Sequence, residues 1–228
     1  MMGDQVMRRS LKAFSTPEML VVIAIGAVLM MLAVPVYQAF HQKGKDTQCI
    51  SNLRQCGLSV LSHANDHNGN SVVAYIPPGE EYDGHPQAGK MWHMFLHEKG
   101  YIRDMRIMVC PAFAPHRWTG TTKVSQTYGL RRNMGEIRYQ PVLKIGRSDR
   151  LSTHVLLADS SKTGTWVGQD YYLELEASGS KSDRIHTRHG HRANIFFADG
   201  SLRALTAEEI VDLEDGWGLK RSIDTVIY

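Results

Sequence analysis

The chain has 228 residues, of which 43% are hydrophobic and 21% are charged. This composition is typical of an ordinary globular domain with an appendage, and it excludes disordered and low-complexity classes. The net charge of +3 comes without a concentrated basic patch, so we expect no nucleic-acid partner. The hydrophobic residues are unevenly distributed, because the N-terminus is very apolar and the remainder is polar.

A long apolar stretch lies between Glu18 and Lys43 and carries no formal charge. At ~1.5 Å per residue, Met19–Phe40 is long enough to cross the ~30 Å hydrocarbon core of a bilayer. We therefore predict a single-pass membrane helix over residues 14–41. The positive-inside rule keeps the basic leader, residues 1–13, in the cytoplasm and places residues 42–228 outside. A cleaved secretory signal and a buried core helix are the alternatives, but the stretch has neither a good cleavage site nor a polar stripe.

The residues just before the apolar stretch suit the start of a helix. Ser15 supplies a capping hydroxyl, Pro17 needs no N–H partner, and Glu18 places an acid at the positive helix end. Ser15 and Glu18 together fit a capping box. An ionised carboxylate at the mouth of a membrane helix is costly, so we expect Glu18 to meet a cation.

The same segment resembles a known signal. Basic residues, the small residue Ala13, then Phe14, an acid four positions later and LVVIAI with Pro35 near its end are similar to the N-terminus of type IV pilins and type II secretion pseudopilins. The resemblance implies that a membrane-embedded prepilin peptidase cuts between Ala13 and Phe14 and methylates the new amine. It also implies that Glu18 neutralises this amine on a neighbouring subunit and that Pro35 kinks the helix. The family usually has glycine at the position of Ala13 and a large aliphatic residue at that of Pro17.

Further elements follow from hydrophobic spacing. An apolar face continues the helix from about Phe14 to Asp66, through Cys49, Leu53, Cys56, Val60 and Ala64. We then predict a strand at Ser71–Tyr75, a loop at Ile76–Lys90, a helix at Met91–Glu98, strands at Thr153–Asp159, Ala193–Asp199 and Ser201–Leu205, and a capped helix after Thr206. Asp199-Gly200 reads as a two-residue hairpin turn with positive φ. One long helix followed by scattered antiparallel strands predicts the α+β class.

The C-terminal part extends the resemblance. The pattern Cys49-x-x-Asn52-Leu53-x-Gln55-x-Gly57, then Cys110-Pro111, Tyr128-Gly129, and His189 followed by Asp199-Gly200, is similar to prepilin-like proteins that carry the H-x(9)-D-G processing-associated domain. The motif region covers about residues 186–205. The resemblance implies a pilin-like fold, in which a long helix packs on a small antiparallel sheet, and a periplasmic globular domain over residues 42–228.

Three cysteines raise the question of a disulfide. Cys49 and Cys56 lie seven positions apart on one helix, about 10.5 Å, which exceeds the ~7 Å Cα limit for a bridge. We favour a bridge between Cys49 and Cys110, which would join the helix to the rest of the domain, with Cys56 buried as a small apolar residue. Three free thiols in the core are the alternative.

A polar cluster contains His186, His189 and His191, and imidazole is an ordinary zinc ligand. We expect His189 and His191 to share one strand face, with Asp199 too far along the strand to join them. Structural histidines that bond to a carbonyl or carboxylate are the preferred interpretation, so no metal or other cofactor is predicted. Asp159 could hold a cation with loop oxygens, but capping or turn formation is the preferred role.

The motifs of common hydrolases, zinc proteases and nucleotide-binding enzymes are absent from the sequence. The resemblance implies the function of a non-enzymatic pseudopilin-like subunit in the bacterial inner membrane, with a prepilin peptidase and other pilin-like subunits as partners. A non-polymerising, membrane-anchored module that binds a glycan, peptide or metal through the loops of residues 172–191 is the alternative. An extracytoplasmic hydrolase ranks last.

Overall fold

A computed structural model describes residues 15–82, 85–118, 126–132, 150–162, 168–174, 184–213 and 223–224. The chain divides into two compact units, Met1–Lys43 and Gly44–Tyr228, and each is considered by itself. The class is α+β, with a long N-terminal helix and small sheets of mixed strand direction.

Helix α1 covers Thr16–Asp66, which confirms the predicted long helix. At its start, the Glu18 carboxylate accepts hydrogen bonds of 2.7 Å from both the N–H and the hydroxyl of Ser15. Pro35 lies inside the helix. The helix ends where Asn68 and Gly69 adopt positive φ, with the Gly69 N–H donating to the Ala64 carbonyl at 2.7 Å. Residues that tolerate left-handed backbone thus end the helix at the predicted place.

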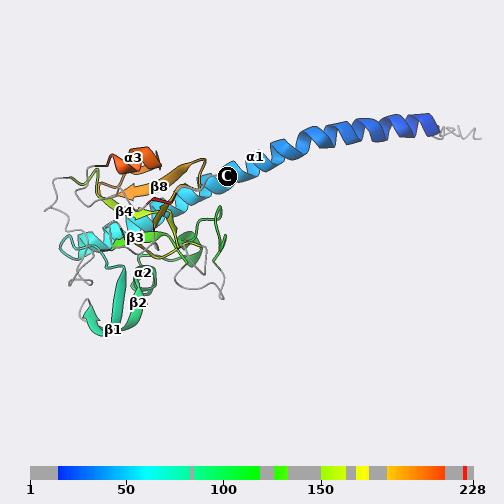
Figure 1. The fold of residues 1–228 in the computed structure, drawn as a ribbon. Coiled ribbons are helices and arrows are strands. Elements are labelled where there is room, and N and C mark those ends of the chain that lie inside the picture. Colours follow the sequence, from blue (N-terminus) through cyan, green and yellow to red (C-terminus); the bar gives the residue numbers. More distant parts are fainter. Residues whose placement is uncertain are drawn as a thin grey trace, which may run out of the picture. The chain divides into compact units, whose positions relative to one another are not determined.

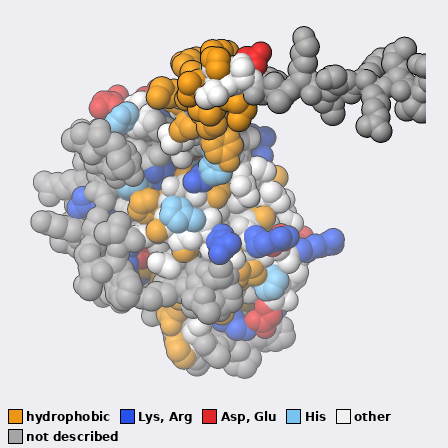
Figure 2. Space-filling model, turned by 90° about the vertical axis from the view of Figure 1, so that its right-hand side faces the viewer, with side chains coloured by type: hydrophobic (Ala, Val, Ile, Leu, Met, Phe, Trp, Pro, Cys, Tyr) orange, Lys and Arg blue, Asp and Glu red, His pale blue; other side chains and the backbone are white. Residues whose placement is uncertain are grey.

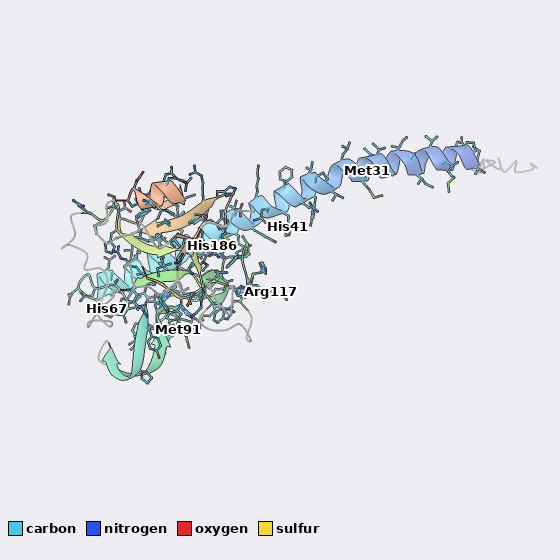
Figure 3. All side chains as sticks on the ribbon, viewed as in Figure 1. Met31, His41, His67, Met91, Arg117 and His186 are labelled. Atoms are coloured by element: carbon cyan, nitrogen blue, oxygen red, sulfur yellow. A yellow bond between two sulfur atoms is a disulfide. The ribbon has the colours of Figure 1, made fainter. Side chains whose placement is uncertain are left out.

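The described part of the first unit is residues 16–43 of α1 with Ser15 before them, and we call this part of the helix its apolar half. Its side chains are exposed at every described position from Ser15 to Lys43 except the half-buried Gly26. Figure 2 shows hydrophobic side chains gathered on this half, and Met31 projects from it in Figure 3. Among the described residues, α1 is the one helix with the length and composition to cross a membrane, properties shared by a membrane anchor and a signal sequence.

The second half of α1 is a core element of the globular unit. The predicted apolar face is confirmed, since its five residues are all fully buried: Cys49, Leu53, Cys56, Val60 and Ala64. Gly57 lets the helix approach strand β8 (Arg192–Phe197) closely, because a Cβ on Gly57 would lie 2.3 Å from the Phe196 ring. The helix therefore packs against the sheet through a site that only glycine fits.

Two strands stand where a loop was predicted. Strands β1 (Tyr75–Tyr82) and β2 (His85–Met91) pair as an antiparallel ribbon next to α2 (Trp92–Glu98), so the Ile76–Lys90 loop prediction is wrong. Each strand has one partner, and proline is tolerated on such edges because only one side of the strand needs a complete hydrogen-bond ladder. Residues 71–74 are buried but irregular, so the strand begins at the last residue of the predicted Ser71–Tyr75 segment. The predicted helix over Met91–Glu98 is confirmed.

The other described strands form two sheets (Figure 1). The five-stranded sheet has the order β6-β3-β4-β8-β9, and the three-stranded sheet has the order β10-β7-β5. Their bounds are β3 Gly129–Arg132, β4 Val155–Ala158, β5 Ser160–Ser161, β6 Tyr172–Glu174, β7 Arg184–His186, β9 Leu202–Thr206 and β10 Ile223–Asp224. The β3–β6 and β7–β10 pairs are parallel and the remaining pairs antiparallel. The expected purely antiparallel sheet is therefore corrected to a mixed one.

The connection after β8 differs from the predicted two-residue hairpin. Only Gly200 has positive φ there, while the Asp199 carboxylate accepts from the Ser201 N–H at 2.9 Å. The Gly200 N–H donates to the Phe197 carbonyl at 3.0 Å, which makes a four-residue turn between β8 and β9. The capping box at Thr206 and Glu209 is confirmed, and it begins the short helix α3 (Ala207–Val211). A 3-10 helix, η1 (Met105–Met108), leads toward Cys110.

Candidate functional site

His189 lies at the start of a tight turn that directs its side chain into the globular unit. His189 and Arg192 exchange backbone hydrogen bonds of 2.9 and 3.2 Å, and the two residues between them, Gly190 and His191, have φ of 58° and 62°. It is a two-residue turn of the kind that was expected at Asp199-Gly200, but it lies before β8 and not after it. The His189 side chain is 7% exposed and His191 is exposed, so the two histidines do not share a strand face as expected.

Two carboxylates from distant segments hold the His189 ring. Its Nδ1 lies 2.8 Å from Oδ1 of Asp46 on α1, and its Nε2 lies 3.3 Å from Oδ2 of Asp159, between β4 and β5. Both ring nitrogens donate when the imidazole is protonated. The ring thereby connects the helix to the end of a central strand.

Asp159 is fully buried and has further polar partners. Arg188 Nε lies 3.9 Å from Oδ1, and the Asn194 N–H donates to Oδ2 at 2.8 Å. The Arg188 guanidinium also lies 4.4 Å above the Phe113 ring and donates to the Ser160 carbonyl. The preferred role of Asp159 as a cap or turn residue is corrected, because a buried carboxylate must be compensated by charge and hydrogen bonds.

These contacts shift two pKa values in opposite directions. Burial by itself would raise the pKa of Asp159, but the charge of Arg188 and the hydrogen bond and charge of His189 outweigh burial and lower it. Burial would lower the pKa of His189, but Asp159 and Asp46 overcome both burial and the repulsion from Arg188, so this pKa is raised. The arrangement favours a carboxylate beside an imidazolium.

The disulfide lies directly against this ring. Cys49 and Cys110, the pair preferred in the sequence analysis, are joined with a Cα–Cα distance of 4.8 Å, and the third cysteine, Cys56, is a buried free thiol. Cys110 Sγ lies 3.5 Å from His189 Nε2. We call the set of Asp46, Asp159, Arg188, His189 and the Cys49–Cys110 disulfide the His189 cluster.

Buried backbone contacts fix the position of both cysteines. The Gln169 amide accepts from the Cys110 N–H at 3.0 Å and donates to the Cys110 carbonyl at 3.0 Å. The Tyr128 hydroxyl donates to the Cys49 carbonyl at 3.0 Å, and the Asn52 amide donates to the Val109 carbonyl at 3.1 Å. Buried polar bonds therefore hold the backbone at both ends of the disulfide.

Among the described residues, one group of side chains has the donors and spacing to hold a metal ion. It comprises Cys49, Cys110 and His189, whose ligand atoms lie within 4.8 Å of one another. In the disulfide form the two sulfurs are not thiolates, and both nitrogens of His189 contact carboxylates. In this form the cluster has a structural role, because it joins α1, the segment around Cys110 and the end of β4.

The other residues singled out from sequence lie elsewhere. His186 is buried in β7, with its ring 4.6 Å from that of Phe113 (Figure 3). Asp199 and Gly200 follow the far end of β8, away from the end that His189 precedes. The motif thus places its histidine and its Asp-Gly pair at opposite ends of one strand. The predicted cleavage position, Ala13–Phe14, lies outside the described residues.

Sequence reasoning missed Asp46, Arg188 and Gln169 as partners of the candidate residues. A signal for Asp46 existed, because it precedes Cys49 by three residues and therefore lies on the same helix face. Arg188 is adjacent to a motif histidine, but no role of its own was predicted for it. Gln169 had no local signal, because its role depends on the folded position of Cys110.

Comparisons with models of protein families, with curated proteins and with solved structures found no match.

Proposed function

We propose that the protein is a non-enzymatic, pseudopilin-like structural subunit of a type II secretion or type IV pilus-like system, inserted in the inner membrane and processed by a prepilin peptidase. The observation that carries this proposal is the division of one continuous helix. One half of α1 exposes apolar side chains all around, and the other half forms the core of a folded domain. A helix that is apolar on every side needs lipid or similar helices around it.

The apolar half of α1 also accounts for insertion into the membrane. An uncharged apolar helix with this length partitions into the bilayer core, and the basic residues before it hold the N-terminus on the cytoplasmic side. The globular unit then faces the periplasm. That compartment favours disulfides, which agrees with the Cys49–Cys110 bridge.

The assembly stage centres on Glu18. In the single chain, its carboxylate is held at the helix start by Ser15. After cleavage before Phe14, the new N-terminal amine of one subunit meets the Glu18 carboxylate of its neighbour. The pairing offsets two charges in apolar surroundings and sets the axial register between subunits.

In this proposal the His189 cluster joins α1 to the other segments of the globular unit. Asp46 and Cys49 lie about one turn apart on α1, in the part of the helix that belongs to the globular unit, and they contact His189 and Cys110 of other segments of that unit. When the helix of a subunit packs against its neighbours or is moved, the globular unit therefore stays attached to it.

Intact mass spectrometry of the membrane-extracted chain tests the processing step. In cells with a prepilin peptidase we expect a mass that begins at N-methylated Phe14, and in cells without the peptidase the full leader. Ala13→Gly should raise the cleaved fraction, since glycine is the residue that the resembled family carries there. A chain that keeps its leader in both strains and in the variant would contradict the proposal and favour the anchored binding module.

Glu18→Ala tests the assembly step. Subunit incorporation, measured by cross-linking within the apolar helix, should be lost, while the globular unit stays folded and disulfide-bonded. Glu98→Ala, which removes an exposed acid from α2, is the matched control and should assemble normally. Normal assembly of Glu18→Ala would show that this carboxylate does not set the register.

A further inference from the structure

We propose that, once its disulfide is reduced, the His189 cluster binds a single Zn²⁺ through the sulfurs of Cys49 and Cys110, Nε2 of His189 and Oδ2 of Asp159. The metal and the disulfide are then alternative ways to fasten the same three segments. This inference stands independently of the proposed function, because it concerns only the globular unit.

Two donor distances at His189 match those of a tetrahedral zinc site. With zinc bonds of about 2.3 Å to sulfur and about 2.0 Å to nitrogen or oxygen, neighbouring ligand atoms in a tetrahedron lie about 3.3 to 3.8 Å apart. Cys110 Sγ and His189 Nε2 are 3.5 Å apart, and His189 Nε2 and Asp159 Oδ2 are 3.3 Å apart. These two distances, from His189 to Cys110 and from His189 to Asp159, are therefore those expected between neighbouring zinc ligands, and Cys49 lies in the same group of donors.

The orientation of His189 also fits. Its Nδ1 contacts the Asp46 carboxylate at 2.8 Å, so a neutral ring that donates from Nδ1 presents the lone pair of Nε2 to the sulfurs. A carboxylate behind a metal-bound histidine is the usual outer partner in zinc sites, where it fixes the tautomer and the ring plane. Asp46 would thus change from a salt-bridge partner to an orienting residue.

Burial and charge favour a closed structural site. Cys49, Cys110 and Asp159 are fully buried, and the His189 side chain is nearly so. Two thiolates balance the charge of Zn²⁺, while the Asp159 carboxylate faces Arg188 through its other oxygen, at 3.9 Å. Four protein donors leave no position for a substrate, which is typical of structural rather than catalytic zinc.

The chemical step is balanced as follows. A trialkylphosphine, with one water, gives two electrons to the disulfide and becomes the phosphine oxide, while the two sulfurs take up two protons and become thiols. Zn²⁺ then replaces the two thiol protons and the proton on His189 Nε2, and three protons pass to solvent. A chain that has not yet been oxidised reaches the metal form without the reductant.

Cobalt binding to the full chain in detergent tests the proposal. The protein is stripped with a chelator and kept under anaerobic conditions, with and without phosphine. We expect the reduced chain to bind one equivalent of Co²⁺ with the bands of tetrahedral cobalt and sulfur-to-cobalt charge transfer, and Zn²⁺ to displace it. The oxidised chain should show neither signal. Because both samples are the same chain, this comparison does not depend on how a variant folds.

Variants identify the ligands. Cys110→Ser should weaken the charge-transfer band, because only the Cys49 thiolate remains, and His189→Gln should weaken zinc binding at least tenfold. Asp46→Asn should weaken it by about 10 to 100-fold, the range for an outer partner. Cys56→Ser is the matched control, because that thiol is buried on the same helix but donates to the Ile107 carbonyl, and it should bind metal like the wild type. Equal binding by the oxidised chain, no binding by the reduced chain, or loss of binding in Cys56→Ser with retention in His189→Gln would each overturn the proposal.

Discussion

Helix α1 places similar side chains in opposite surroundings. Leu29 is 62% exposed and Leu53 is fully buried, although both lie in one uninterrupted helix. Around Leu29 the apolar residues cover all sides, whereas around Leu53 they recur at steps of three and four with polar residues between them. The pattern of apolar residues, more than their number, therefore distinguishes the two halves of α1. The half around Leu29 needs apolar surroundings from outside the chain, and the half around Leu53 forms part of the core. Four substitutions test how these surroundings determine the effect of a change in the side chain.

The largest effect is expected in the packed half, at the disulfide. Cys110→Ser opens a loop closed across a sequence separation of 61, which should lower the free energy of unfolding of the globular unit by about 4 kcal/mol. Denaturant unfolding of the full chain, with a chelator present, measures this. Reduced wild type should lose the same amount and Cys56→Ala much less. A loss equal to that of Cys56→Ala would show that the bridge contributes little.

The proposed membrane helix predicts that a charge in the apolar half of α1 will oppose membrane insertion. Leu29→Arg places a guanidinium near the middle of the apolar stretch, at a cost of about 3 kcal/mol for insertion. The matched variant is Leu58→Arg, because Leu58 is 51% exposed on the packed half of the same helix. Alkaline extraction of membranes should release Leu29→Arg and retain Leu58→Arg. Equal retention would break the distinction between the two halves.

The same glycine substitution should have opposite effects at two positions of α1. Gly57→Ala should lower the free energy of unfolding by about 2 to 3 kcal/mol, because the added Cβ meets the Phe196 ring at 2.3 Å. Gly44→Ala meets nothing within 4 Å and should raise it by up to about 1 kcal/mol through helix propensity. Thermal unfolding of both variants gives the sign. Destabilisation by both would mean that the Phe196 contact is not the cause.

The smallest effect concerns pH. Burial, helped by the charge of Arg131, lowers the pKa of His154 to about 4 from an ordinary value of 6.5. Between these two pH values the His154 ring binds a proton in the unfolded chain but not in the folded chain. The contribution of His154 to the free energy of unfolding is therefore fully present above pH 6.5 and is lost as the pH falls toward 4. After allowance for the partial exposure of the ring, the loss should be about 2 kcal/mol. His154→Phe should flatten this part of the pH profile relative to wild type, and an unchanged profile would show that this ring is not the cause.

The elements that were predicted correctly are those with strong local patterns. The helix over Thr16–Asp66, the capping box at Thr206 and the strand before Asp199 all follow from spacing or from cap residues. The β1–β2 ribbon was missed because its prolines and glycines have the composition of a loop, and only pairing between the two segments makes them strands. The two-residue turn at Gly190-His191 was missed because these two residues are not a typical turn sequence.

The candidate site divides in the same way. His189 and the Cys49–Cys110 pair could be singled out from sequence, because histidine and cysteine are rare and chemically distinctive. Their common location could not, since 79 positions separate Cys110 from His189 and 143 separate Asp46 from His189. The importance of Asp159 was underestimated, because a carboxylate after a strand looks like a turn residue until its burial is known.

The sequence by itself determined the division of α1, because a run of apolar residues without a polar stripe cannot belong to the core of a small domain, while a spaced apolar face can. Only the tertiary structure decided which side chains meet around His189. The reason is that local periodicity places each element's faces, whereas the meeting of Asp46, Cys110 and Asp159 depends on how sheets and helix pack over long sequence separations.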